Sequence, residues 1–138
     1  MDDVEEIKKL KARYFRCLDT KDWDGYRGVF TDDVFLDLPT PEGRGTQQGI
    51  DTFMDYVRAL TIVQSVHHGH MPEIELTSPT TATGIWAMED HVQFREGYES
   101  HGYGHYHETY EKADGRWRIK TMKLSYLRMD VAPYSPGD

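Results

Sequence analysis

Apolar side chains near the start of the chain recur at steps of three and four residues, which predicts an amphipathic helix over residues 3–18. The positions that form this apolar stripe are Val4, Ile7, Leu10, Tyr14 and Leu18. Asp3 and Glu6 have the spacing of an N-terminal cap and its reciprocal partner, so we expect Asp3 to cap this helix.

The segments that follow predict two more helices and one strand. A shorter helix opens at Asp22, and its apolar residues are Trp23, Tyr26, Val29 and Phe30. Residues 34–38 form a predicted strand that ends at two prolines, and the proline- and glycine-containing residues 39–49 are predicted to be a loop. Apolar residues at helical spacing predict a third helix over residues 50–60.

β-Branched and aromatic residues dominate after residue 62, which predicts an antiparallel meander. The predicted strands are Val63–Met71, Glu73–Leu76, Thr83–Phe94, Tyr98–Lys112 and Arg116–Met129. Helices followed by such a meander indicate an α+β fold. A long, twisted sheet curls, so we expect one domain over residues 1–138, in which three helices on the concave side of the sheet enclose a cone-shaped pocket.

Charge limits the kinds of partner that this chain can bind. Its 24 acidic and 16 basic residues give 138 residues a formal net charge of −8. A negative field repels phosphate, so we expect neither nucleic acid nor an anionic membrane as a partner. The expected partner is a hydrophobic small molecule.

Two further features bear on location and cysteine chemistry. No apolar run reaches the roughly 18–20 residues that span a bilayer, and the acidic start Met1-Asp2-Asp3 is unlike a basic signal peptide. We therefore expect a cytoplasmic protein. The single Cys17 excludes a disulfide framework, and its place inside the first helix indicates packing rather than nucleophilic chemistry.

The end of the first helix carries two residues that have more than one interpretation. Tyr14 can be a core residue with a satisfied hydroxyl, and Asp19 can cap the helix that contains Trp23. Alternatively, Tyr14 is a buried phenol that donates a hydrogen bond to a substrate oxyanion, and Asp19 orients a base.

Seven histidines are concentrated in the strand region. On a strand, His67 points away from His68 and His70, whereas His105 and His107 share a face. Such pairs with a carboxylate can hold zinc or iron, but they also occur on surfaces, and the chain has no HExxH motif. We expect no metal and no cofactor, and His67 alone suffices as a general acid or base.

Asp90 continues the strand face that carries Trp86 and Met88. An ionisable group on an apolar face must be paired or its pKa shifts, which makes Asp90 a candidate site residue. The alternative is that the strand has ended and Asp90 is solvated. Arg128 can bind an acidic substrate group or balance Asp90, although most single arginines at strand ends do neither.

The segment EEIKKLKARYFRCLDTKDWDGYRGVFTDD resembles the start of SnoaL-like domains, which belong to the nuclear transport factor 2-like superfamily. YEKADGRWRIK is similar to their penultimate turn. This resemblance implies a cystatin-like curved sheet and, in many relatives, dimers or trimers, so we expect a homodimer or homotrimer. LKARYFRCLDTKDWD, SVHHGHMPEIEL and TATGIWAMED further resemble the bile acid 7-alpha-dehydratase branch of the superfamily.

The resemblance also implies a set of site residues. Tyr14 takes the position of a catalytic tyrosine, Asp19 and His67 that of an Asp–His dyad, and Asp90 that of a second aspartate. The arginine of the family falls on Arg128 if two residues are inserted after WRIK, and otherwise Tyr126 occupies its place. We expect Arg128, Tyr126, Trp86 and His107 to contact substrate.

The function that these residues suit is proton transfer without a cofactor. We expect a dehydratase that acts on a steroid-like or polyketide-like hydroxy-carbonyl compound. Alternatives are a ketosteroid-isomerase or polyketide-cyclase activity, or a small-molecule-binding protein without catalysis. The loop at 39–49 and the hairpin from Arg95 to Tyr106 differ from the bile acid branch, and these segments would select the substrate.

Overall fold

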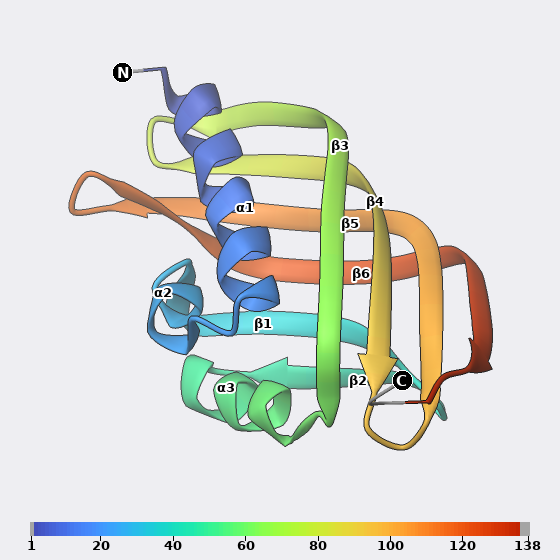
Figure 1. The fold of residues 1–138 in the computed structure, drawn as a ribbon. Helices are drawn as coiled ribbons and strands as arrows, with labels where there is room; N and C mark the ends of the chain where they lie inside the picture. Colours follow the sequence, from blue (N-terminus) through green and yellow to red (C-terminus); the bar gives the residue numbers. More distant parts are fainter. Residues whose placement is uncertain (1, 136–138) are drawn as a thin grey trace.

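The computed structural model describes residues 2–135, which form three helices and one six-stranded sheet (Figure 1). The helices are α1 (Asp3–Asp19), α2 (Trp23–Arg27) and α3 (Ile50–Ala59). The strands are β1 (Phe30–Thr40), β2 (Gly43–Gln48), β3 (Ile62–Ser78), β4 (Thr81–Phe94), β5 (Tyr98–Ala113) and β6 (Arg116–Pro133). The sheet order is β2-β1-β6-β5-β4-β3, with β1 and β6 parallel and all other neighbours antiparallel. The predicted α+β class with a curved sheet is confirmed.

The helices begin and end close to their predicted bounds. The cap of α1 is Asp2, whose carboxylate accepts from the backbone N–H of Val4, so the assignment of the cap to Asp3 was wrong by one residue. Asp3 instead accepts hydrogen bonds from Lys112 and Trp117. The helix α2 opens at Asp22 as predicted, and Asp22 itself is the cap, so the alternative role of Asp19 as this cap was wrong. The helix is only five residues long, and Phe30 already belongs to β1.

Residues 39–49 were predicted to be a loop, and this prediction was wrong. Residues 43–48 form β2, which pairs antiparallel with β1 and ends the sheet. Pro39 is tolerated inside β1 because the ladder between β1 and β6 extends only to Asp37 and Lys123, so no β6 carbonyl lacks a donor at that point.

The predicted break between the strands Val63–Met71 and Glu73–Leu76 is a bulge in one long strand. β3 continues from residue 62 to residue 78, and its register shifts between His70 and Glu73. Met71 has a φ of 39° and an 88% exposed side chain at this point. The irregularity bends the strand without ending it.

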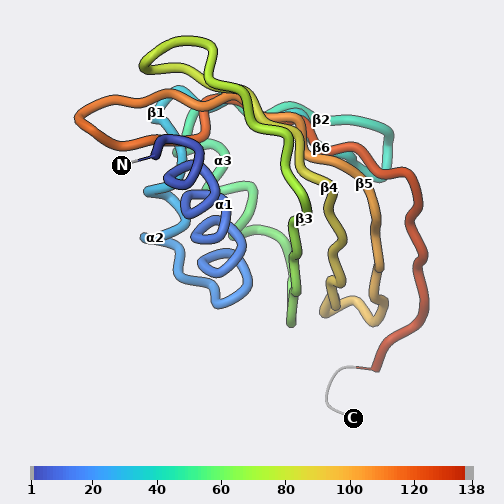
Figure 2. The backbone as a smooth tube through the Cα atoms, turned by 90° about the horizontal axis from the view of Figure 1, so that it is seen from above, coloured from blue at the N-terminus to red at the C-terminus, as the bar shows by residue number. Residues whose placement is uncertain are grey.

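The sheet curves around the three helices, and the far ends of β4, β5 and β6 extend past them (Figure 2). The concave side holds the core, in which aromatic residues from α1, α2 and the sheet pack edge to face. The deep part of the expected cone is therefore filled by side chains, including Tyr14, Tyr26 and Tyr106, each less than 5% exposed. No helix within residues 2–135 has the length and apolar character needed to cross a membrane.

Candidate active site

Asp19 and His67 meet where the last turn of α1 packs against β3. The Nδ1 atom of His67 lies 2.7 Å from Oδ1 of Asp19, and the backbone N–H of His67 donates to Oδ2 at 2.8 Å. The hydroxyl of Ser65 donates to Oδ1 at 2.9 Å. In a neutral imidazole, a carboxylate that accepts from Nδ1 fixes the proton there and leaves the lone pair on Nε2. The imidazole is only 11% exposed.

Asp90 lies directly across from His67 on the neighbouring strand. Residues paired in this way share a face, and their Cβ atoms are about 4.5–5.5 Å apart. The Tyr126 hydroxyl donates to Oδ2 of Asp90, while Oδ1 is buried without a hydrogen-bond partner among the described residues. Burial raises the pKa of the Asp90 carboxyl, an effect that the Tyr126 hydrogen bond and the nearby His67 partly oppose.

A glycine makes the contact between Tyr126 and Asp90 possible. Gly102 is paired with Asp90, and a Cβ atom at this position would lie 2.4 Å from the Tyr126 ring and 2.9 Å from Oδ1 of Asp90. Any larger side chain at Gly102 would therefore displace the tyrosine from the carboxylate.

Tyr14 is buried in the core, where other aromatic rings surround it. Its hydroxyl is 3.8 Å from the sulfur of Met122, and no hydrogen bond joins it to Asp19, His67 or Asp90 within residues 2–135. Burial raises the pKa of Tyr14 well above its usual value. The structure thus places Tyr14 beneath the dyad rather than in contact with it.

Tyr106 is a site candidate that the sequence reasoning missed. Its ring centroid is 5.8 Å from that of Tyr14, and its buried hydroxyl has no hydrogen-bond partner among the described residues. Burial raises the pKa of Tyr106, the nearby Tyr14 hydroxyl opposes this shift, and Tyr126 and Asp90 add to it. Unpaired polar atoms in a core call for an explanation, and a ligand that they bind is one. Strand parity could have identified Tyr106, since it shares a face with Gly102.

Trp86 belongs to a buried hydrogen-bonded chain rather than to an open wall. Its Nε1 donates to the Tyr110 hydroxyl at 3.0 Å, and Tyr110 donates to Glu108 at 2.6 Å. The other Glu108 oxygen accepts from Lys11 at 2.6 Å, and both side chains of this ion pair are fully buried. The Lys11 ammonium lies 3.7 Å from the Tyr14 ring centroid.

Arg128 and His107 do not face this site. In β6, Leu127 is the extra residue of a bulge, because Gly104 pairs with Tyr126 whereas Tyr103 pairs with Arg128. Tyr126 and Arg128 would share a face in a regular strand, but the bulge places them on opposite faces. Arg128 is exposed and pairs with Asp130, and Tyr126 occupies the place beside Asp90.

His107 lies with five other histidines on the convex face of the sheet, opposite His67. These residues are His68, His70, His91, His101 and His105. Glu89 contacts His70 and His101, and Glu99 contacts His91. Within residues 2–135, no group of three or more His, Cys, Asp or Glu side chains has the arrangement of a metal site.

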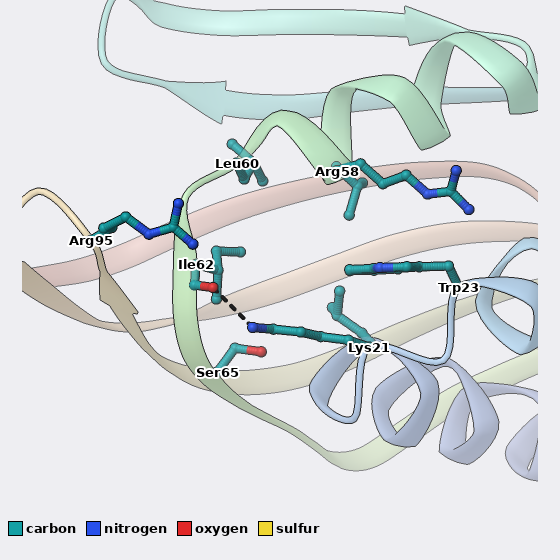
Figure 3. A pocket seen from close by; sticks show the side chains of 9 residues that line it. Lys21, Trp23, Arg58, Leu60, Ile62, Ser65 and Arg95 are labelled. Atoms are coloured by element: carbon teal, nitrogen blue, oxygen red, sulfur yellow. Dashed lines mark hydrogen bonds between the residues drawn. The ribbon is translucent and has the colours of Figure 1, made fainter. Parts of the chain in front are cut away.

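A cavity of about 210 Å³ lies next to the dyad, between α3, the loop after α1 and the start of β3 (Figure 3). Ser65 lines this cavity and also donates to Asp19. Its other lining residues include Lys21, Trp23, Arg58 and Arg95, which are labelled in Figure 3. A ligand in the cavity is separated from the dyad by one hydrogen-bonded side chain.

The sequence is similar to known proteins along most of its length. The family model for the SnoaL-like domain matches residues 1–123. The probable cyclase FGR4 of Gibberella zeae is 24% identical over 133 residues, which cover 88% of this chain and 89% of that protein.

Solved structures share the fold at low sequence identity. A scytalone dehydratase-like protein of Novosphingobium aromaticivorans is 19% identical and has a TM-score of 0.82 over 99% of this chain and 94% of its own. The hexachlorocyclohexane dehydrochlorinase LinA-type3 of Novosphingobium barchaimii is also 19% identical, with a TM-score of 0.82 over 99% and 92%. A protein of Nostoc punctiforme with a cystatin-like fold is 21% identical, with a TM-score of 0.72 over 90% of each chain.

Proposed function

Because the chain belongs to the SnoaL-like domain family, we propose that it is a cofactor-independent lyase that removes water from a hydrophobic hydroxy-carbonyl compound. The observation that carries this proposal is the 2.7 Å contact between Asp19 and His67, on the same face of the sheet as Asp90. The imidazole of His67 supplies a base, the Asp19 carboxylate orients it, and the Asp90 carboxyl supplies an acid.

His67 acts as the base in this proposal. Asp19 fixes the proton on Nδ1, so Nε2 removes a proton from the carbon next to the substrate carbonyl. The electron pair of the broken C–H bond forms the new C=C bond as the C–O bond to the hydroxyl breaks.

Asp90 acts as the acid that protonates the leaving hydroxyl. Tyr126 donates to Oδ2, so the proton of a neutral Asp90 lies on Oδ1, the atom without a partner. Burial raises the pKa of this carboxyl and so favours its neutral form. The hydroxyl takes this proton and leaves as water, and His67 returns its proton to Asp90 through solvent.

A cyclase activity is the second candidate, and its support is the similarity to FGR4. The same base would remove a proton next to a carbonyl, and the resulting carbanion would attack a second carbonyl of the same molecule. The two activities share His67 and differ in whether water is released.

The test is a screen of hydroxy-ketone steroids and polyketides for formation of an enone, which absorbs in the ultraviolet. We expect the His67→Ala variant to lose about a hundredfold or more in turnover. His68→Ala is the matched control, since His68 is the adjacent residue on the opposite, exposed face. Equal turnover by the His67→Ala variant and the wild type would refute the mechanism, and an inactive wild type would favour a binding role.

A further inference from the structure

The cavity in Figure 3 carries a charge opposite to that of the whole chain. Three of its nine lining residues are basic and none is acidic, although the net charge of the protein is −8. Lys21 comes from the loop after α1, Arg58 from α3 and Arg95 from the turn after β4. Three segments that are distant in sequence therefore bring positive charge to one small space.

The two arginines have unused hydrogen-bonding capacity. Lys21 donates to the backbone carbonyls of Ile62 and Val63 at 3.0 and 3.3 Å. Within the described residues, the side chains of Arg58 and Arg95 form neither an ion pair nor a hydrogen bond, and both are exposed to the cavity. Each guanidinium is free to bind an oxyanion with two parallel N–H donors.

A second cavity of similar size shows that this charge pattern is not general. It encloses about 200 Å³ and is also lined by a tryptophan and by three basic residues, Arg13, Lys112 and Arg116. However, Asp3 and Glu6 line it as well, and Lys112 lies 3.1 Å from the Asp3 carboxylate. The second cavity thus has two carboxylates in its wall, one of them paired with Lys112, whereas no carboxylate lines the first cavity.

The first cavity also has an apolar wall. Figure 3 shows the flat Trp23 side chain between those of Lys21 and Arg58, and Leu60 and Ile62 lie on the opposite side. Drug-sized ligands occupy about 300–1,000 Å³, so a volume of about 210 Å³ accommodates a small molecule or one end of a larger one.

We propose that this cavity binds the carboxylate of a small organic acid, with Arg95 on the carboxylate and the apolar part of the acid against Trp23, along which the Arg58 side chain runs. The part of this inference that makes the acid a substrate rests on the proposed function. Ser65 connects the two sites, because it lines the cavity and donates to the Asp19 carboxylate that holds His67. The substrate class of the dyad would then be an acidic, partly apolar hydroxy-carbonyl compound.

Calorimetric titration with phenylacetate tests the site without any turnover. We expect phenylacetate to bind, and uncharged phenylacetamide and inorganic phosphate each to bind about tenfold more weakly or worse, because the first lacks the charge and the second the apolar body. Arg95→Gln should weaken phenylacetate binding about tenfold. Arg58→Gln should weaken it less, because the Arg58 guanidinium points away from Arg95 (Figure 3).

Arg13→Gln is the matched control, since it removes the same charge from the second cavity. An equal loss of affinity in Arg13→Gln would overturn the proposal, because it would show general attraction of anions rather than a built site. Equal binding of phenylacetate and phenylacetamide would also overturn it. The phenylacetate titration is repeated on His67→Ala. If phenylacetate binds to this variant but the wild type converts none of the screened hydroxy-ketones, the proposed function is refuted and the acid site is supported.

Discussion

The Asp90 side chain is buried, and its Oδ1 atom has no hydrogen-bond partner among the described residues. Both features lower the stability of the folded protein. The folded pKa of Asp90 is raised, so the folded state holds a proton that the unfolded state has lost once the pH exceeds the usual aspartate pKa of 3.8. This contribution to stability is fully present below pH 3.8 and is lost as the pH rises through the folded pKa.

We therefore expect Asp90→Asn to raise the free energy of unfolding at neutral pH by about 0.5–2 kcal/mol while it lowers turnover. Urea denaturation at several pH values measures the difference, which should shrink towards pH 3.8. A variant that is less stable than the wild type at neutral pH would contradict this reasoning.

Lys11 titrates in an unusual range because it is buried. Burial lowers the pKa of its ammonium to about 8, although the Glu108 carboxylate opposes this shift. Between about pH 8 and the usual lysine pKa of 10.5, the unfolded state binds more protons than the folded state. The contribution of Lys11 to stability therefore rises with pH across this window.

Comparison with Lys11→Met isolates this effect from the titration of the tyrosines. We expect the free energy of unfolding of the wild type to increase relative to that of Lys11→Met between about pH 8 and 10.5. A constant difference across this range would show that Lys11 has an ordinary pKa.

At the level of the strand, the bulge in β6 depends on a glycine in β5. A Cβ atom on Gly104 would lie 1.9 Å from the backbone oxygen of Ser125, and a backbone atom cannot move away as a flexible side chain can. We expect Gly104→Ala to destabilise the protein by about 2 kcal/mol or more.

Gly28→Ala is the control for this prediction. Gly28 has a φ of −68°, and the nearest atom to a Cβ there is 3.4 Å away, so its effect should be within about 0.5 kcal/mol. Urea denaturation compares the two variants. Equal free energies of unfolding for Gly104→Ala and Gly28→Ala would contradict the prediction, because β5 and β6 would then move apart at Gly104 with little loss of stability.

Hydrophobic periodicity was sufficient to predict most helices and strands. It identified α1 and α3 because each buries one regular face. Enrichment in β-branched and aromatic residues, with turn signals, identified the strands after residue 62, although it divided β3 into two. It missed β2, an edge strand of exposed and half-exposed polar residues and glycines, because such a strand has no buried face to produce a pattern.

The site was predictable only where regular strand geometry holds. Parity placed His67 and Asp90 on the inner face, and the same rule separated His67 from His68. The orientation of Arg128 was not predictable, since one extra residue in β6 reverses the parity and no local motif marks the bulge. The charge of the cavity depends on three segments whose contact only the fold reveals.

For the whole molecule, the distribution of titratable groups matters more than their number. Protonation of all seven histidines would change the formal net charge from −8 to −1, and six of these histidines lie on the convex face. With a sequence pI of about 5.3, we expect a solubility minimum near that pH. Light scattering from about pH 8 to about pH 4 measures it, and a flat profile would contradict the prediction.

The assembly state stays a prediction that a mass measurement can decide. We expect a homodimer or homotrimer in sedimentation equilibrium at neutral pH. A sheet with one uncovered face favours association, and histidine charge on that face should weaken it as the pH falls. A monomer at every concentration would contradict this expectation.

The bulge at Leu127 offers a practical route to observing ligands. Leu127 is 80% exposed and lies next to Tyr126, whereas the native Cys17 is 1% exposed. A thiol-reactive fluorophore would therefore attach selectively to Leu127→Cys. The dye would lie next to Tyr126, which donates to Asp90, on a residue outside the regular strand pairing. Its emission would report ligand binding at the site without any knowledge of the reaction.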